Sequence, residues 1–293
     1  MQVPQLSGQG RAGSDNLTQM LTEPELPARI PTRQSGDSLP PDSAERSTRW
    51  KVFETLASTN DSIHEAASSG APEGTVHIAL RQTRGRGRAG HVWWSPSGAG
   101  LWMTVLLRPR LAPDAVAAIA LLAGKATRQA LAPLVRQPIE LYWPNDLYVG
   151  RRKLGGILGE MRNSAAGFWI ALGVGVNICL DPAAVPEELD GQVVDLAEIG
   201  CSERDPLPLA SRITDALFHE YDRLHAGEPL SAMLVDDLAH VGSRVSVRQE
   251  GQPELEGTAI GVGDGGELLV RSHEGEIHRV LAGDVTYHGD SEC

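Results

Sequence analysis

The alternation of apolar and polar residues predicts a protein built mainly on β-strands. Short segments alternate in polarity or are apolar throughout, and turn residues bound them, as is typical of half-buried and fully buried strands. Strands are expected at 51–56, 75–82, 101–109, 139–143, 146–149, 155–161 and 168–178. The turns between the last four segments are short, which favours antiparallel neighbours in one sheet.

The sequence predicts four helices, two of them long and two short. A short helix follows Ser58, since Ser58 and Asp61 have the spacing of a capping box. Long amphipathic helices are expected within 114–132 and 209–227, and a short one at 230–239. A helix with a single apolar stripe packs on a sheet, so the pattern predicts an α+β protein.

The chain divides into three regions by composition. Residues 1–48 hold six prolines and no aromatic residue, which predicts a disordered tail. Residues 49–240 carry the mixed strands and helices described above. Residues 241–290 change to short alternating strands separated by Gly-containing turns, and this spacing predicts a small β-barrel.

Charge and composition narrow the classes of partner. The 293 residues include 26 Lys and Arg against 38 Asp and Glu, a net charge of −12, so nucleic acid is not an expected partner. The longest apolar run is about half of the ~20 residues that a membrane span needs. The first residues lack the pattern of a secretory signal, so a cytoplasmic location is expected. The three cysteines, Cys179, Cys201 and Cys293, are too far apart to predict a zinc site or a disulfide framework.

A glycine- and arginine-rich stretch at 85–90 is the first candidate for chemistry. It matches the dinucleotide-binding pattern G-x-G-x-x-G, but no helix is expected to follow it, so a Rossmann site is rejected. Arg86 and Arg88 stand beside Gly87, which leaves its backbone N–H accessible, and this combination suits phosphate oxygens. The alternative is a solvated basic loop.

A second candidate is the segment from Asn145 to Lys153. If 147–149 and 154–160 pair as a hairpin, Lys153 returns toward Asn145 and Asp146 on one side of the sheet. Glycine within a strand, as at Gly156, indicates close approach of a ligand or of another backbone. The alternative is a turn with a solvated lysine.

Several motifs follow one another in the order found in a known family. They are Ser58-Thr59-Asn60, Gln82, GRGRAGHVWWSP, WPND, KLGGILGE and GVGVN, followed by the C-terminal barrel. On these motifs the chain resembles the biotin protein ligases over about residues 50–288. The resemblance implies a mixed sheet with helices on one face, of the class II synthetase-like type that biotin and lipoate ligases share, and a small SH3-like barrel.

The resemblance also implies a reaction. Biotin is activated with ATP as biotinyl-5′-AMP and is then transferred to a lysine of a biotin carboxyl carrier protein. Mg²⁺ would arrive on the triphosphate, without a direct protein site. No protein nucleophile is required, because the biotin carboxylate is already ionised at neutral pH.

Site residues carry over motif by motif. The resemblance assigns biotin binding to Ser58, Thr59, Asn60, Gln82, Arg86, Gly87, Arg88 and Lys153. It assigns the nucleotide side to Asn145, Asp146, Gly156 and Asn177, with Asp146 serving either the metal or the acceptor amine. Arg86, Arg88 and Lys153 would be the catalytic cations, since the two reacting groups are anions.

Three positions depart from the family pattern. Ala89 and His91 stand where arginines are usual, and Tyr142 stands where a lysine often precedes the WPND motif. The lower positive charge leaves one alternative open, a weakly active or non-catalytic protein that binds biotin or its adenylate. The shared architecture implied by the resemblance leaves another, a lipoate or octanoate ligase. A helix-turn-helix head is not expected within residues 1–48, so a ligase without repressor function is predicted, with homodimerisation left open.

Overall fold

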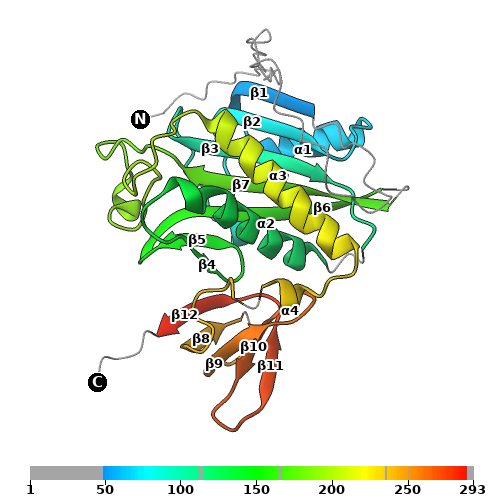
Figure 1. Ribbon diagram of the computed structural model, residues 1–293, viewed down its shortest axis with the longest axis vertical. Helices are drawn as coiled ribbons and strands as arrows, with labels where there is room; N and C mark the ends of the chain where they lie inside the picture. The colour runs from blue at the N-terminus through cyan, green and yellow to red at the C-terminus, as the bar shows by residue number, and fades with distance from the viewer. Residues whose placement is uncertain (1–48, 112–114, 165–166, 235, 250, 289–293) are drawn as a thin grey trace, which may run out of the picture.

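A seven-stranded sheet forms the larger part of the computed structural model, which describes residues 49–111, 115–164, 167–234, 236–249 and 251–288 (Figure 1). Its strands are β1 (Arg49–Leu56), β2 (Thr75–Gln82), β3 (Gly100–Leu107), β4 (Glu140–Tyr142), β5 (Asp146–Val149), β6 (Arg152–Ser164) and β7 (Gly167–Asn177). They lie in the order β1-β2-β3-β7-β6-β5-β4. Only β1 and β2 pair in parallel, so the sheet is mixed, as predicted.

Two long helices, α2 (Val116–Leu131) and α3 (Pro206–His225), lie across one face of this sheet (Figure 1). Alternate side chains of a strand point to opposite faces. Leu101, Met103 and Val105 of β3 join the main hydrophobic core with residues of α2 and α3. The long helices therefore stabilise the sheet by burying its apolar face.

The first helix, α1 (Thr59–Ser68), lies on the opposite face. Leu106 of β3 packs with Ile63 and Ala67 of α1 in a separate apolar cluster. The prediction of helices on one face is therefore correct for α2 and α3 and wrong for α1. Ser58 occupies the N-cap position, but its side chain makes no capping hydrogen bond, so the predicted capping box does not form.

The C-terminal strands form a five-stranded antiparallel sheet. They are β8 (Arg244–Arg248), β9 (Leu255–Val262), β10 (Leu268–Arg271), β11 (Ile277–Val280) and β12 (Asp284–His288), in the order β11-β10-β9-β8-β12. Gly283, with a φ of 158°, lies between β11 and β12. The predicted helix at 230–239 is reduced to α4 (Leu230–Met233).

Tyr142 and Trp143 connect the large sheet to the C-terminal sheet. The Trp143 indole donates to the carbonyl oxygen of Gly266 at 2.8 Å, and the Tyr287 hydroxyl donates to the carbonyl oxygen of Trp143 at 3.2 Å. Tyr142 packs against His240 and Tyr287 with ring centroids 4.4 and 5.1 Å apart. Tyr142 is therefore a packing residue of this junction.

Within the described residues, no helix has both the length and the apolar character needed to cross a membrane. The predicted tail at 1–48 and the last two residues of the predicted barrel, 289–290, lie outside the described residues.

Candidate active site

A cavity of about 370 Å³ opens on the same face of the large sheet as α1. Every site residue predicted from the sequence lines it: Ser58, Thr59, Asn60, Gln82, Arg86, Gly87, Arg88, Asn145, Asp146, Lys153, Gly156 and Asn177. These residues come from the start of α1, the end of β2, the loop before β3, the β5–β6 hairpin and the end of β7. The fold thus brings together motifs that are far apart in the sequence.

The start of α1 forms one polar end of the cavity. The Thr59 backbone N–H donates to Gln82 Oε1 at 2.8 Å, and Gln82 Nε2 donates to Ser95 Oγ at 3.0 Å. These bonds hold the Gln82 amide in one orientation. The buried Ser58 hydroxyl has no hydrogen bond to the described part of the chain, so it remains open to a ligand in the cavity.

Asn60 differs from its neighbours because protein groups accept from both N–H donors of its amide. Its Oδ1 accepts from the Thr104 hydroxyl at 2.6 Å. Its Nδ2 donates to Glu160 Oε2 at 2.8 Å and lies 3.5 Å from the carbonyl oxygen of Leu158. The amide therefore ties α1 to β3 and β6, and it has no free donor left for a ligand.

The glycine-rich loop is a tight turn fixed at both ends. Trp93 N donates to the carbonyl oxygen of Gly85 at 3.0 Å, and Gly87 N donates to that of His91 at 2.7 Å. Ala89 has a φ of 51°, in the left-handed region. A literal match to a nucleotide motif is therefore a compact turn here, with no helix behind it.

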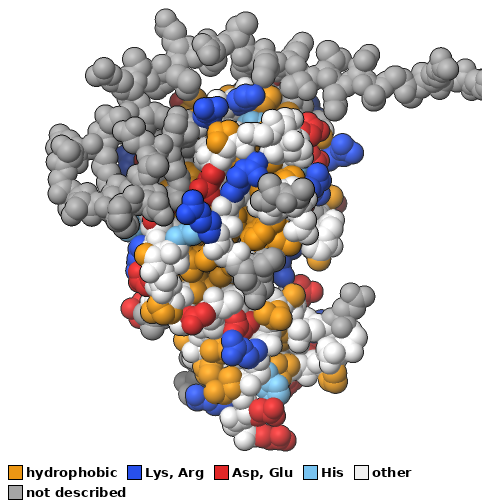
Figure 2. Space-filling view, turned by 90° about the vertical axis from the view of Figure 1, so that its right-hand side faces the viewer, with side chains coloured by type: hydrophobic (Ala, Val, Ile, Leu, Met, Phe, Trp, Pro, Cys, Tyr) orange, Lys and Arg blue, Asp and Glu red, His pale blue; other side chains and the backbone are white. Residues whose placement is uncertain are grey.

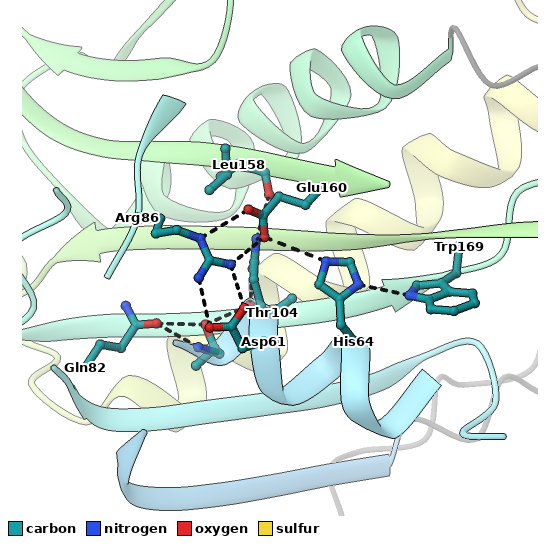
Figure 3. A network of polar contacts seen from close by, with 10 residues as sticks. Asp61, His64, Gln82, Arg86, Thr104, Leu158, Glu160 and Trp169 are labelled. Atoms are coloured by element: carbon teal, nitrogen blue, oxygen red, sulfur yellow. Dashed lines mark hydrogen bonds and ion pairs between the residues drawn. The ribbon is translucent and has the colours of Figure 1, made fainter. Parts of the chain in front are cut away.

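The Arg86 guanidinium points from this loop toward α1 and β6 (Figure 3). It donates to both carboxylate oxygens of Asp61 at 2.9 Å and to both of Glu160 at 3.2 and 2.9 Å. These charge-assisted bonds raise the pKa of Arg86. Arg86 lines the cavity, but its charge is engaged by two carboxylates.

The β5–β6 hairpin brings Lys153 back to Asp146, as its spacing predicted. Asp146 pairs with Gly156 across the hairpin, and the Lys153 ammonium lies 2.7 Å from Asp146 Oδ2. The same ammonium lies 5.5 Å from the centre of a Trp93 ring, within the range of a cation–π contact. Lys153 is therefore held at the cavity by one carboxylate and one aromatic wall.

Arg88 connects the loop to the hairpin. Its Nη1 lies 3.4 Å from Asn145 Oδ1, and Asn145 Nδ2 donates to the carbonyl oxygen of Ile157. Asn177 Nδ2 donates to the carbonyl oxygen of Val194 at 3.0 Å, so this amide orders a neighbouring segment. The two cation-bearing loops thus meet over one cavity.

Glycines leave space in the cavity because they have no side chain. A Cβ added to Gly175 would lie 2.8 Å from two atoms of the Trp93 indole, closer than van der Waals contact allows. Gly175→Val is expected to displace that indole and to lower the free energy of unfolding by about 1–3 kcal/mol, the usual cost of overpacking. Equilibrium urea unfolding checks this, and an unchanged free energy of unfolding would contradict it.

Several residues at the site escaped the sequence prediction. Thr104, Asp61 and Glu160 hold other site residues, and Asp284 reaches the cavity rim from the C-terminal sheet. The KLGGILGE motif ends on Glu160, which was the one available signal. Asp61 was noted only for its capping-box spacing, and Thr104 and Asp284 show no local pattern, because only tertiary structure brings them to the cavity.

Among the described residues, no group of three or more His, Cys, Asp or Glu side chains is arranged to hold a metal ion. Asp146 is the predicted metal contact, and its carboxylate is paired with Lys153. A divalent cation at this site would therefore need most of its ligands from a bound substrate.

The Glu160 carboxylate makes the stability of the fold depend on pH in the acid range. Burial raises the pKa of Glu160, but hydrogen bonds from His64, Arg86 and Asn60 outweigh it and lower the pKa to about 2. A depressed folded-state pKa stabilises the fold above the ordinary value of 4.5, and that stabilisation is lost as pH falls toward 2. Glu160→Gln is expected to lower the free energy of unfolding at pH 7, with a deficit that shrinks between pH 4.5 and 2. Urea titrations across that range check it, and a constant deficit would contradict it.

Comparisons with known proteins agree with this geometry. The model of the Biotin/lipoate A/B protein ligase family matches residues 52–177, and that of the Biotin protein ligase C terminal domain matches residues 240–286. A biotin–acetyl-CoA-carboxylase ligase of Mycobacterium tuberculosis is 33% identical over 269 residues, which cover 86% of this chain and 98% of the relative. The chain belongs to the biotin protein ligase family.

This ligase has further relatives in other bacteria. The Bacillus subtilis bifunctional ligase/repressor BirA is 29% identical over 236 residues, covering 79% of this chain and 72% of BirA. The biotin protein ligase of Aquifex aeolicus, solved in complex with biotin and ATP, shares the fold with a TM-score of 0.69 at 24% identity, covering 82% and 98% of the two chains. These comparisons confirm the predicted fold class, including the C-terminal domain, and the prediction that the protein is a biotin ligase enzyme.

Proposed function

We propose that this ligase activates biotin with ATP, forming biotinyl-5′-AMP and pyrophosphate, and then transfers the biotinyl group to a lysine of a biotin carboxyl carrier protein. The observation that carries the proposal is the meeting of Arg88 and Lys153, from two separate loops, over one cavity. The M. tuberculosis relative, which acts on acetyl-CoA carboxylase, and the A. aeolicus complex with biotin and ATP support it.

The first step joins two anions. A carboxylate oxygen of biotin attacks the α-phosphorus of ATP, and pyrophosphate leaves as the P–O bond to it breaks. Lys153 and Arg88 lower the repulsion between the carboxylate and the triphosphate and stabilise charge on the transferring phosphorus. The Trp93 wall beside Lys153 excludes water from the mixed anhydride that forms.

The second step needs an amine. The lysine of the carrier protein attacks the acyl carbon, and AMP leaves. Asp146 is suited to accept a proton from that ammonium, or to contact Mg²⁺ carried by ATP, because Lys153 holds its carboxylate at the cavity. In either role Asp146 must exchange partners when substrate binds.

Residues at the start of α1 recognise the ureido ring in this proposal. Ser58 contributes a free hydroxyl, and Gln82 contributes an amide fixed by Thr59. Buried polar groups of this kind reject ligands that cannot pair with them. Asn60 holds α1 in place against β3 and β6, since both of its N–H donors bond to protein groups and its oxygen accepts from Thr104.

On the nucleotide side, Asn145, Gly156 and Asn177 are proposed to line the ATP site. Space is tight at Gly156, because an added Cβ would lie 3.1 Å from Asp146 Oδ1 and would press on that carboxylate. We further propose that 49–240 is the catalytic unit and 241–290 the C-terminal unit. Use of ATP and a carrier protein favours the cytoplasm.

Nucleic acid has no place in the proposed activity. On the face that Figure 2 shows, Lys and Arg side chains are interspersed with Asp and Glu side chains. Together with the net charge of −12, this gives no broad basic surface on that face.

One assay separates the proposal from its alternatives. The protein is incubated with Mg-ATP, a carrier domain, and either biotin or lipoate, and pyrophosphate release and carrier labelling are measured separately. Biotin-dependent release followed by labelling is the expected result. Binding of biotin without pyrophosphate release would support the non-catalytic alternative, and turnover of lipoate alone would replace biotin as the substrate.

A further inference from the structure

Arg86 stands in a different electrostatic setting from the other two cations of the site. Two carboxylates, Asp61 from α1 and Glu160 from β6, grip one guanidinium with a hydrogen bond to each of their four oxygens (Figure 3). One positive charge faces two negative ones, so Arg86 offers no net positive charge to an anionic ligand. Arg88, by contrast, has one 3.4 Å contact with a neutral amide.

The grip on Arg86 fixes the loop that carries Arg88. Arg86 lies between Gly85, which is bonded to Trp93, and Gly87, which is bonded to His91. Holding its side chain against α1 and β6 therefore fixes the backbone turn from outside. Because Arg88 lies two residues further along the same turn, its backbone is fixed as well.

Contacts from Trp169, His64 and Asn60 hold the Glu160 carboxylate in place. The Trp169 indole donates to His64 Nδ1 at 3.0 Å, which leaves the proton of the imidazole on Nε2, 3.7 Å from Glu160 Oε2. Asn60 donates to the same carboxylate at 2.8 Å. These contacts orient Glu160 independently of Arg86. Together with the bonds to Arg86 they connect α1, the loop, β6 and β7.

We propose that Asp61 and Glu160 are positioning residues for adenylation, which hold Arg86 as an anchor so that the glycine loop and Arg88 cover the cavity. The inference rests on the proposed function. It changes the role of Arg86: the sequence predicted a catalytic cation, and the geometry makes it the fixed point of the loop.

The sign of one substitution tests this. Asp61→Asn frees part of the Arg86 charge. If Arg86 is an anchor, biotin-dependent pyrophosphate release falls in kcat by about tenfold, the loss typical of one charge-assisted hydrogen bond. If Arg86 binds substrate directly, its freed charge lowers the KM for biotin or ATP. A lower KM, or unchanged kcat, overturns the proposal.

Companion variants separate positioning from general damage. Glu160→Gln is expected to act as Asp61→Asn does, and Asp61→Glu, which restores the charge, is expected to recover most of the activity. Glu65→Gln removes a carboxylate from the exposed side of the same helix and is expected to leave kcat unchanged. Equal losses in Glu65→Gln would overturn the proposal.

Limited trypsin digestion reads the loop without relying on activity. Cleavage after Arg88, assigned by mass spectrometry, is expected to be about tenfold faster in Asp61→Asn and Glu160→Gln than in the wild type or Glu65→Gln, because opening of the loop exposes that bond. Equal cleavage rates overturn the anchor. If the wild type releases no pyrophosphate, the proposed function fails, and the digestion still decides the anchor.

Discussion

Lys153→Ala is expected to reduce biotin-dependent pyrophosphate release by roughly a hundred- to a thousandfold, the largest catalytic effect of any single change in this chain. Removing one preorganised charge from the reacting centre has effects of that size. Lys153 sits at the meeting point of the hairpin and the glycine loop, and no other lysine lines the cavity within the described residues. Pre-steady-state pyrophosphate release with saturating Mg-ATP and biotin measures the change.

The fold is expected to survive, since Lys153 is partly exposed and its strand partners bond through the backbone. Arg151→Ala is the matched control. Arg151 is an exposed cation in the turn that leads to Lys153, and its removal is expected to leave the rate unchanged. Wild-type turnover in a folded Lys153→Ala variant would refute the role given to Lys153.

Lys125→Ala is expected to produce the largest loss of stability, about 3–5 kcal/mol in the free energy of unfolding. Lys125 is buried in α2, and its ammonium donates to the carbonyl oxygen of Met233 at 2.5 Å. It also lies 3.4 Å from Glu220 and 3.3 Å from Asp237. Removing it takes one of two cations from the 2%-exposed Glu220, which keeps Arg223 Nη1 at 2.8 Å, and removes a cation beside the 14%-exposed Asp237.

Equilibrium urea unfolding measures this loss. Arg212→Ala, on the exposed side of α3, is the control and is expected to change stability by less than about 0.5 kcal/mol. Lys125→Met keeps the length of the side chain and removes only the charge, so a similar loss in that variant assigns the effect to the ion pairs. A loss below about 1 kcal/mol in both Lys125 variants would contradict the prediction.

The polarity pattern predicted most elements because burial on one face imposes a period on the sequence. The strands of the large sheet and both long helices lie where the pattern put them. The pattern does not say which face a helix covers, and α1 lies opposite α2 and α3. It also placed the end of the short helix too late, since the helix predicted at 230–239 ends at Met233.

The sequence predicted which residues form the site. The structure shows which of them are open to a ligand and which hold other residues in place. Motif order placed Arg86 and Asn60 at the cavity, but their partners lie 74 and 100 residues away in Glu160. Such pairings depend on strand order, which a single sequence does not encode locally. The sequence therefore names the residues around the cavity but does not separate those open to a ligand from those that hold the others in place.

The junction at Trp143 has a consequence for how the protein can be divided. The Trp143 indole and carbonyl both bond to the C-terminal sheet, while Asn145, two residues on, faces the cavity. A chain truncated after residue 240 would lose the acceptor of a buried indole N–H and the aromatic cover of Tyr142. Such a fragment would be a damaged enzyme, and split-protein or fusion designs should cut elsewhere.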